Sequence, residues 1–333
     1  MSGALAYLDE QIEAIRTRLP AALHDFDSAA IHQSRVGTRR LKAGFDVLAP
    51  LLADLNADGL GKAGKMLRRR LGPLRDLDVM IAALGQAGLP AKSAAAAEWI
   101  VARLEADRTD ARAASMLPPK KAIKLISRFD DWWRVRHGLE SLADGVTPLL
   151  TAALHERFDA FAGLADRVAG LTAETDDLPP IDLHELRIDG KAVRYAFEIA
   201  AAHGLPIPKK VAKTFKAMQD ALGDWHDAVV LADAILKATL DADLPLHRQG
   251  LASAVLDVAR VYLQRSERAL ATFVTLWKRG GVGLRTTLAE RVPLISETSA
   301  SRVEVTDDTP TSVANESVDS GGPTGGTTER VVR

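Results

Sequence analysis

The sequence predicts an all-α protein made of two related helical halves, followed by an acidic tail. Three observations carry this prediction: a body rich in Ala and Leu whose apolar residues recur three and four positions apart, few aromatic residues (5%), and an internal duplication. With 333 residues, 47% of them hydrophobic and 26% charged, the chain has the balance of a packed globular protein.

The helices are expected in order along the body, wherever Pro and Gly leave the helical period uninterrupted. Leu5, Leu8, Ile12 and Ile15 share one helical face near the start, and the apolar residues of 217–222 share another. Breaks are predicted at residues 20, 50, 59–61, 85–90, 118–119, 148, 179–180, 204–208, 245 and 280–281. These breaks leave roughly eight to ten helices of the length found in bundles.

The duplication joins two pairs of segments. Residues 32–45 match residues 184–197 without a gap, and residues 71–76 match residues 222–227. The offset is 152 for the first pair and 151 for the second, so the spacing of the motifs is nearly the same in each half. Two unrelated segments would hardly keep this spacing by chance.

Each copy of the first motif carries four ionisable residues at positions i, i+3, i+7 and i+10, which share one helical face. We call these two sets the basic faces: His32, Arg35, Arg39 and Lys42 in the first copy, and His184, Arg187, Lys191 and Arg194 in the second. No carboxylate lies between residues 32 and 45, so the cations of the first copy are expected to lack helical partners. Like charges this close repel one another, and an anion would relieve the repulsion. An ordinary solvated face is the alternative, but its repetition in two copies favours an anion site.

Further basic residues precede the second motif in each half. They are Lys62, Lys65 and Arg69 in the first half and Lys209, Lys213 and Lys216 in the second. If the halves pack about a twofold axis, the two basic faces can line a common cleft. Arginine would supply forked donors for phosphate oxygens there, and lysine a mobile point charge.

Composition excludes several classes of protein. Because the chain has no cysteine, disulfides and thiolate chemistry are excluded, and a reducing compartment such as the cytoplasm is expected. The longest stretch without Asp, Glu, Lys or Arg, residues 79–91, is shorter than the about 18 residues of a membrane helix. The N-terminus lacks the basic flank and apolar segment of an export signal. No membrane partner and no export are therefore expected.

The acidic tail is predicted over residues 289–333, after a helical domain at 1–288 with halves at about 1–118 and 119–288. From residue 297 onward there are seven acidic and three basic residues, so this part carries a charge of −4 and the rest +3. The tail is rich in Thr, Ser and Gly and has no helical period, which predicts disorder.

Two other groups of residues are weaker candidates for a functional site. Asp76, Asp78 and Asp227, with His226 nearby, suggest a divalent cation, but aspartates in such positions more often cap a helix or pair with arginine. The neighbouring tryptophans 132 and 133 suggest a stacking platform for bases, but are expected instead to pack a helix against the bundle. No metal site and no cofactor are predicted.

These motifs also carry a family resemblance. The run His-x-x-Arg-Val-x-x-Arg-Arg-Leu-Lys from residue 32, its partner His-Glu-Leu-Arg-Ile-x-x-Lys-x-x-Arg-Tyr from residue 184, and the two Leu-Gly-x-x-x-Asp segments resemble the CHAD family. That α-helical domain is named for its histidines. The resemblance covers roughly residues 5–285. A Glu-x-Glu-x-Lys strand, which would mark a fused triphosphate-tunnel (CYTH) barrel, is not found, so this looks like the stand-alone form.

The resemblance implies two four-helix bundles related by an internal twofold around a basic cavity that binds inorganic polyphosphate, often in association with polyphosphate granules. The binders it implies are the residues of the two basic faces together with Arg40, whose counterpart is Ala192. Divalent cations that accompany polyphosphate are a candidate partner. In the second Leu-Gly segment, His226 stands where the first has Arg75, so a symmetric use of that position is not implied.

The leading expectation is therefore a non-catalytic polyphosphate-binding protein. A nucleic-acid-binding protein is a second class, against which stand a pI near 6.7 and scarce aromatic residues. A phosphohydrolase or phosphotransferase acting on polyphosphate is the third class. The usual phosphate-binding loop, nucleophile elbow and zinc helix are missing from the sequence.

Overall fold

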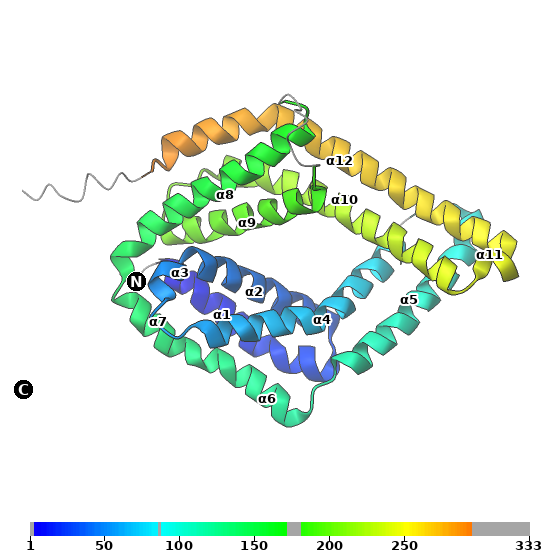
Figure 1. Ribbon diagram of the computed structural model, residues 1–333, viewed down its shortest axis with the longest axis horizontal. Helices are drawn as coiled ribbons and strands as arrows, with labels where there is room; N and C mark the ends of the chain where they lie inside the picture. The colour runs from blue at the N-terminus through cyan, green and yellow to red at the C-terminus, as the bar shows by residue number, and fades with distance from the viewer. Residues whose placement is uncertain (1–2, 86–87, 172–180, 295–333) are drawn as a thin grey trace, which may run out of the picture. The chain divides into compact units, whose positions relative to one another are not determined.

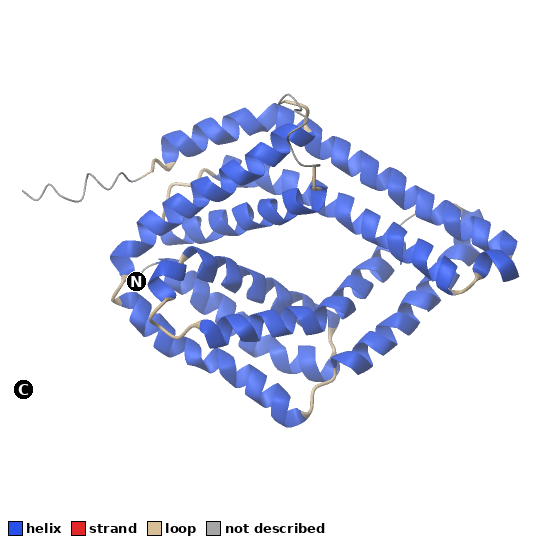
Figure 2. Ribbon diagram, in the orientation of Figure 1, coloured by secondary structure: helices blue, strands red, loops and turns tan. Residues whose placement is uncertain are grey.

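The computed structural model describes residues 3–85, 88–171 and 181–294, and within these ranges the chain is helical without any strand (Figure 2). The all-α prediction is confirmed. Figure 1 shows the helices in chain order. Their bounds are α1 (Gly3–Pro20), α2 (Ser28–Val47), α3 (Ala49–Leu52), α4 (Asp58–Gly85), α5 (Ala94–Ser115), α6 (Pro119–Ser127), α7 (Trp132–Glu140), α8 (Val146–Val168), α9 (Leu183–His203), α10 (Lys209–Asp241), α11 (Leu244–His247) and α12 (Gln249–Arg291).

One predicted break was wrong, because residues 280–281 lie deep within α12. The break predicted at residues 59–61 falls in the first turn of α4, next to the start of that helix, as the break at residue 148 does in α8. A Cβ atom on Gly281 would come within 2.9 Å of the Trp277 ring, and one on Gly280 within 3.2 Å of the Met218 side chain. These glycines therefore serve close packing and do not end the helix.

The apolar residues form three hydrophobic cores. The first core contains residues of α1, α2, the first part of α4, α6 and α7. The second contains residues of α8, α9, the first part of α10 and the last part of α12. The third is built from the ends of α4 and α10 together with α5 and the first part of α12. The arrangement is compatible with two related bundles, and it adds a core to which both halves contribute.

The helices that follow the predicted boundary at residue 118 pack on the first core. Leu125, Phe129 and Leu139, which follow the expected boundary at residue 118, are buried in the first core. The second core begins at Leu154, in α8. The reason is that α6 and α7 bury their apolar sides against the first core and extend it. At the other end, α12 continues to Arg291, past the expected end of the helical domain at residue 288. The rest of the predicted tail, from residue 295, lies outside the described residues.

The long helices α4 and α10 each take part in two cores, and the change falls at the duplicated Leu-Gly segment. In α4, Leu71 and Leu74 belong to the first core and Met80 to the third. In α10, Leu222 belongs to the second core and Ala228 to the third. The two Leu-Gly segments therefore hold corresponding places, where the halves approach one another.

The two tryptophans after α6 behave differently. Trp132 is buried, donates from Nε1 to Oδ1 of Asp9 at 2.7 Å and stacks on Phe45, as expected for a residue that packs a helix against the core. Trp133 is exposed, with the guanidinium of Arg134 over its ring.

No helix in the described part of the chain has the length and hydropathy needed to cross a membrane.

Candidate anion-binding site

The two basic faces lie on α2 and α9, and an aspartate caps the start of each helix. Asp27 accepts a hydrogen bond from the backbone N–H of Ala30 at 2.7 Å, and Asp182 accepts one from His184 at 2.7 Å. Such caps satisfy backbone donors that the first turn leaves unpaired. α2 therefore begins four residues before His32 and α9 one residue before His184, and the basic residues lie on the following turns of each helix.

The arginine in the first turn after each histidine lies beside the aspartate of its own Leu-Gly segment. Arg35 Nη2 is 3.7 Å from Asp76 Oδ1, and Arg187 Nη2 is 3.8 Å from Asp227 Oδ1. Both arginines are largely buried, with side chains 9% and 15% exposed. Both distances exceed a hydrogen bond, so each aspartate offsets the charge without binding the guanidinium directly. The duplication thus recurs as the same pair in the tertiary structure.

The glycine of the first Leu-Gly segment makes room for Arg35. A Cβ atom on Gly72 would lie 2.9 Å from Arg35 Nη1, the atom that donates to the backbone carbonyl of Arg68 at 2.6 Å. The equivalent Gly223 has open space around its missing Cβ. The glycine therefore has a steric role in the first half that is not repeated in the second.

The arginines of both halves meet at one pocket of about 220 Å³. Its walls come from α2, α4, α9 and α10. The lining residues are Arg35, Arg39, Asp76, Val79, Met80, Arg187, His226, Asp227 and Val230. We call this the central pocket. Three of the eight residues of the basic faces, Arg35, Arg39 and Arg187, line this pocket. The other five, His32, Lys42, His184, Lys191 and Arg194, are not among its lining residues.

Positive charge dominates the electrostatics around the central pocket. Burial and the charges of Arg187 and Arg39 lower the pKa of Lys191 to about 7. Burial, with Arg187 and His184 nearby, lowers the pKa of His226 to about 4. The pKa of His32 is also lowered, by partial desolvation and by Arg75 and Arg39. Basic groups whose pKa is lowered by burial and by neighbouring positive charges indicate a site that a bound anion would stabilise.

Two guanidinium nitrogens at this site are buried without a hydrogen bond. Within the described residues, Nε of Arg35 and Nε of Arg187 have no acceptor. Buried donors are normally paired, and an orphaned donor of a charged group carries a penalty of about 1–3 kcal/mol or more. The same atom is orphaned in both halves, so the duplication extends to the unpaired donor of each arginine.

A sequence profile of the CHAD domain matches residues 6–236. The chain belongs to the CHAD domain family. The matched region includes both basic faces and both Leu-Gly segments, and the comparison detects no triphosphate-tunnel domain. The resemblance drawn from the four motifs is therefore confirmed.

Solved structures share the CHAD fold with this chain. The crystal structure of the CHAD domain from the plant Ricinus communis is 22% identical, with a TM-score of 0.51, covering 88% of this chain and 91% of that one. PptA from Streptomyces chartreusis is 20% identical, with a TM-score of 0.50, covering 83% of this chain and 98% of that one. At these identities the likeness shows the fold alone. No curated protein sequence matches this chain.

The far ends of the two basic faces are paired with carboxylates in this CHAD protein, so the expectation that the first-copy cations lack partners was wrong for Lys42. Its Nζ donates to Asp46 at 2.5 Å, one turn later. Arg40 and Arg194 both donate to Glu198, at 2.7 and 3.0 Å. The sequence window that ended at residue 45 stopped one residue short of Asp46. Arg194 and Glu198 are likewise one turn apart on α9, whereas Arg40 and Glu198 are 158 positions apart and meet only through helix packing.

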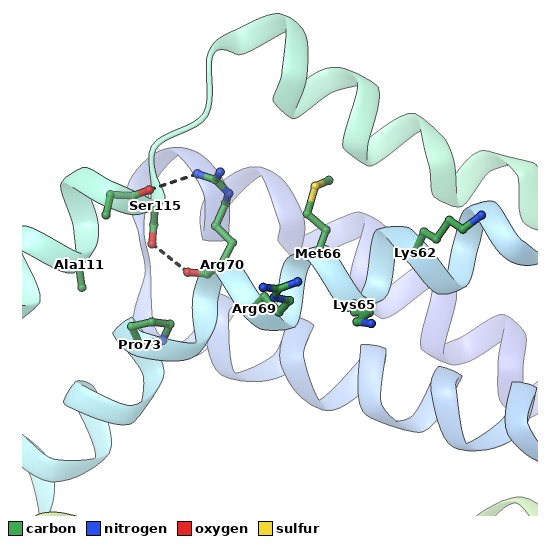
Figure 3. Close-up of a pocket in the computed structure, with 9 residues that line it drawn as sticks. Lys62, Lys65, Met66, Arg69, Arg70, Pro73, Ala111 and Ser115 are labelled. Atoms are coloured by element: carbon green, nitrogen blue, oxygen red, sulfur yellow. Dashed lines mark hydrogen bonds between the residues drawn. The ribbon is translucent and has the colours of Figure 1, made fainter.

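The lysine clusters before the Leu-Gly segments do not line the central pocket. Lys62, Lys65 and Arg69 lie on a different part of α4, beside the end of α5 (Figure 3). In α10, Lys209, Lys213 and Lys216 are exposed, and Lys216 donates to Asp220 at 2.5 Å. Their place along α4 and α10 puts them before the segments at which the halves meet.

Two residues of the second motif are closer to the central chemistry than the sequence suggested. Arg75 lies near enough to lower the pKa of His32, and His226 stacks near His184 with 5.4 Å between ring centroids. Arg75 and His226 occupy equivalent positions, each beside the histidine of its own half. The signal was present in the duplication, but the change of residue type obscured it.

The aspartates considered for a metal ion have other partners. Asp78 accepts from Arg108 Nε at 2.7 Å, and Asp76 and Asp227 face arginines. In the described ranges no group of three or more His, Asp or Glu side chains is placed to hold a metal ion.

Proposed function

We propose that this CHAD protein binds inorganic polyphosphate in the central pocket, does not catalyse its turnover, and associates with polyphosphate granules in the cytoplasm. The observation that carries the proposal is the convergence of Arg35 and Arg187, equivalent residues of the two halves, on one pocket with Arg39. Membership of a family associated with polyphosphate supplies the identity of the anion.

The chemistry of the pocket suits a chain of phosphates. A guanidinium offers several donors in a fixed fork, and Arg35 uses one nitrogen for a protein carbonyl while its Nε is without an acceptor. Phosphate oxygens would accept from such donors in charge-assisted hydrogen bonds. Arg39 and Lys191 extend the positive charge along α2 and α9, so neighbouring units of the chain can be bound together.

The two aspartates of the pocket support a binding role. Asp76 and Asp227 lie beside Arg35 and Arg187 and limit their mutual repulsion, which lets two buried arginines face one cavity without a ligand. Because the ion pairs are longer than hydrogen bonds, a phosphate oxygen can compete for the guanidinium. Burial and the neighbouring cations lower the pKa of His226 to about 4, so this residue is neutral near pH 7 and adds no charge to the repulsion between the arginines.

The test uses a double variant that leaves both buried arginines in place. We expect Arg39→Ser with Lys191→Ser to weaken binding of long-chain polyphosphate by at least about tenfold, because two charge-assisted contacts are lost. Lys278→Ser with Arg279→Ser, two exposed residues of α12, removes one lysine and one arginine away from the pocket and should change affinity by less than about twofold. Affinity of the wild type should also fall with salt, more steeply than that of the pocket variant.

Three results would overturn the proposal. The first is equal affinity in the pocket variant and the α12 control. The second is displacement of polyphosphate by duplex DNA at the same phosphate concentration, which would indicate a nucleic-acid-binding protein. The third is release of orthophosphate from polyphosphate by the wild type but not by a His184→Ala variant, which would indicate an enzyme.

A further inference from the structure

A second basic surface lies away from the central pocket, on the side of α4 that faces α6. Its groove has a volume of about 870 Å³ and is formed by α4, the connection after Ser115, and α6. We call it the α4–α6 groove. Met66 stands between Lys62 and Arg70 on this side of α4 (Figure 3). None of its lining residues is among those of the central pocket.

The rim of the α4–α6 groove is cationic. Five basic residues and no carboxylate line it: Lys62, Arg70, Lys121, Lys124 and Arg128. Within the described chain the three basic residues from α6 and its end form no ion pair. Lys62 lies 3.5 Å from Asp58, but both side chains are largely exposed, so this pair contributes little.

Arg70 has a different role from the other cations of the rim. Its Nη1 donates to the backbone carbonyls of Ala114 and Met116 at 3.3 and 3.0 Å. Its own carbonyl accepts from the Ser115 hydroxyl at 2.9 Å (Figure 3). These bonds fix the connection between α5 and α6 against α4. One wall of the groove is therefore held in place before any partner binds, which lowers the entropy lost on binding.

The floor of the groove is apolar and partly open to solvent. Met66 and Met116 are 44% and 64% exposed, while Leu125 beneath them is buried. Methionine is flexible and adapts to apolar partners, and it is over-represented at surfaces that bind amphipathic helices. A partner that covered both methionines would bury apolar area in addition to pairing with the rim.

We propose that the α4–α6 groove binds an acidic amphipathic helix of a partner protein. Such a helix presents apolar residues three and four positions apart, flanked by carboxylates, and so complements both the floor and the rim. The lining of α4 from Gly59 to Arg70 spans about 16 Å, which is about three turns of a helix. A polyphosphate chain has no apolar side and would leave the methionines in water. A bilayer would engage apolar side chains that project, whereas these line a concave surface.

The inference goes beyond polyphosphate binding and is tested separately from it. A random library of 16-residue peptides would be selected on the full chain with polyphosphate present, which occupies the central pocket under the proposed function. Met66→Asp with Lys124→Glu changes the floor and the rim of the groove. Leu246→Asp with Lys237→Glu makes matched changes at an exposed leucine of α11 and an exposed lysine near the end of α10.

The expected result is enrichment of peptides rich in Asp and Glu with apolar residues at i, i+3 or i+4 spacing. Their affinity should fall by about tenfold or more in the groove variant and stay unchanged in the matched control. Polyphosphate affinity should be the same in all three proteins. The proposal is overturned if the selected peptides are not acidic, or if the groove variant binds them as well as the wild type does. It is also overturned if anionic phosphatidylserine vesicles, but no peptide, distinguish the groove variant from the wild type.

Discussion

Arg40 of α2 donates from Nε to Oε2 of Glu198 in α9 at 2.7 Å, so an ion pair joins the two copies of the duplicated motif. The same carboxylate accepts from Arg194 at 3.0 Å and from the Tyr7 hydroxyl at 3.1 Å. Glu198 therefore holds together α1, α2 and α9, next to the contact between the halves. It also engages two arginines that the family resemblance places among the polyphosphate binders.

Removing the charge of Glu198 should weaken the fold and free the two arginines. We expect Glu198→Gln to lower the free energy of unfolding by about 1–3 kcal/mol, since the side chains of Arg40 and Glu198 are only 29% and 24% exposed. Polyphosphate affinity should rise a few-fold because a negative charge is lost. Denaturant unfolding and a binding titration measure the two effects. Glu185→Gln, an exposed change on α9, is the control, and an equal loss of stability there would contradict the role given to Glu198.

The two glycines of the Leu-Gly segments provide a matched pair of variants. In Gly72→Ala the new Cβ would displace the guanidinium of Arg35, so polyphosphate affinity should fall several-fold. In Gly223→Ala the Cβ meets nothing within 4 Å, so affinity should be unchanged and stability should rise by about 0.5–1 kcal/mol. Equal polyphosphate affinity of the two variants would show that Arg35 does not contribute to the binding site.

Binding should depend on pH through Lys191. Its pKa is about 7 in the free protein, and a bound polyphosphate would raise this pKa toward the ordinary lysine value. Below pH 7 the lysine is charged in both states. Above pH 7 binding must take up a proton, so affinity should fall by at most about tenfold per pH unit between pH 7 and 9. Titrations across this range measure the slope.

Lys191→Arg is the diagnostic variant for this pH effect. Arginine stays protonated, so the affinity of Lys191→Arg should be nearly flat between pH 7 and 9. A slope in Lys191→Arg as steep as in the wild type would show that another group titrates.

Close packing of α9 on α10 makes Gly190 a stability determinant. A Cβ there would lie 1.9 Å from Gln219 Nε2 and 3.0 Å from the Phe161 ring. We expect Gly190→Ala to destabilise the protein by about 1–3 kcal/mol, as overpacking does. Gly163→Ala, at an exposed position of α8 with open space around it, should leave the melting temperature unchanged or raise it. A neutral Gly190→Ala would mean that Gln219 moves away freely.

Several features could be predicted from the sequence because they depend on residues close together in the chain. The helical period and the alignment of His32, Arg35 and Arg39 on one face are local properties of a helix. The break predicted at residues 280–281 was wrong because a pair of glycines can either end a helix or let a neighbouring side chain pack closely against it. In α12 the glycines allow Trp277 and Met218 to pack closely, and this tertiary packing cannot be read from the local sequence.

The sequence by itself determined an all-α chain with two copies of a basic motif, since the helical periodicity and the duplication both follow from the order of the residues. The pairs Lys42–Asp46 and Arg194–Glu198 are also local, since their members are four positions apart on one helix. Only the tertiary structure decided that Arg35, Arg39 and Arg187 reach one pocket and that Arg40 is paired with Glu198, 158 positions away. The physical reason is that Coulomb energy and desolvation depend on distances through space, and helix packing sets these distances between residues far apart in the chain.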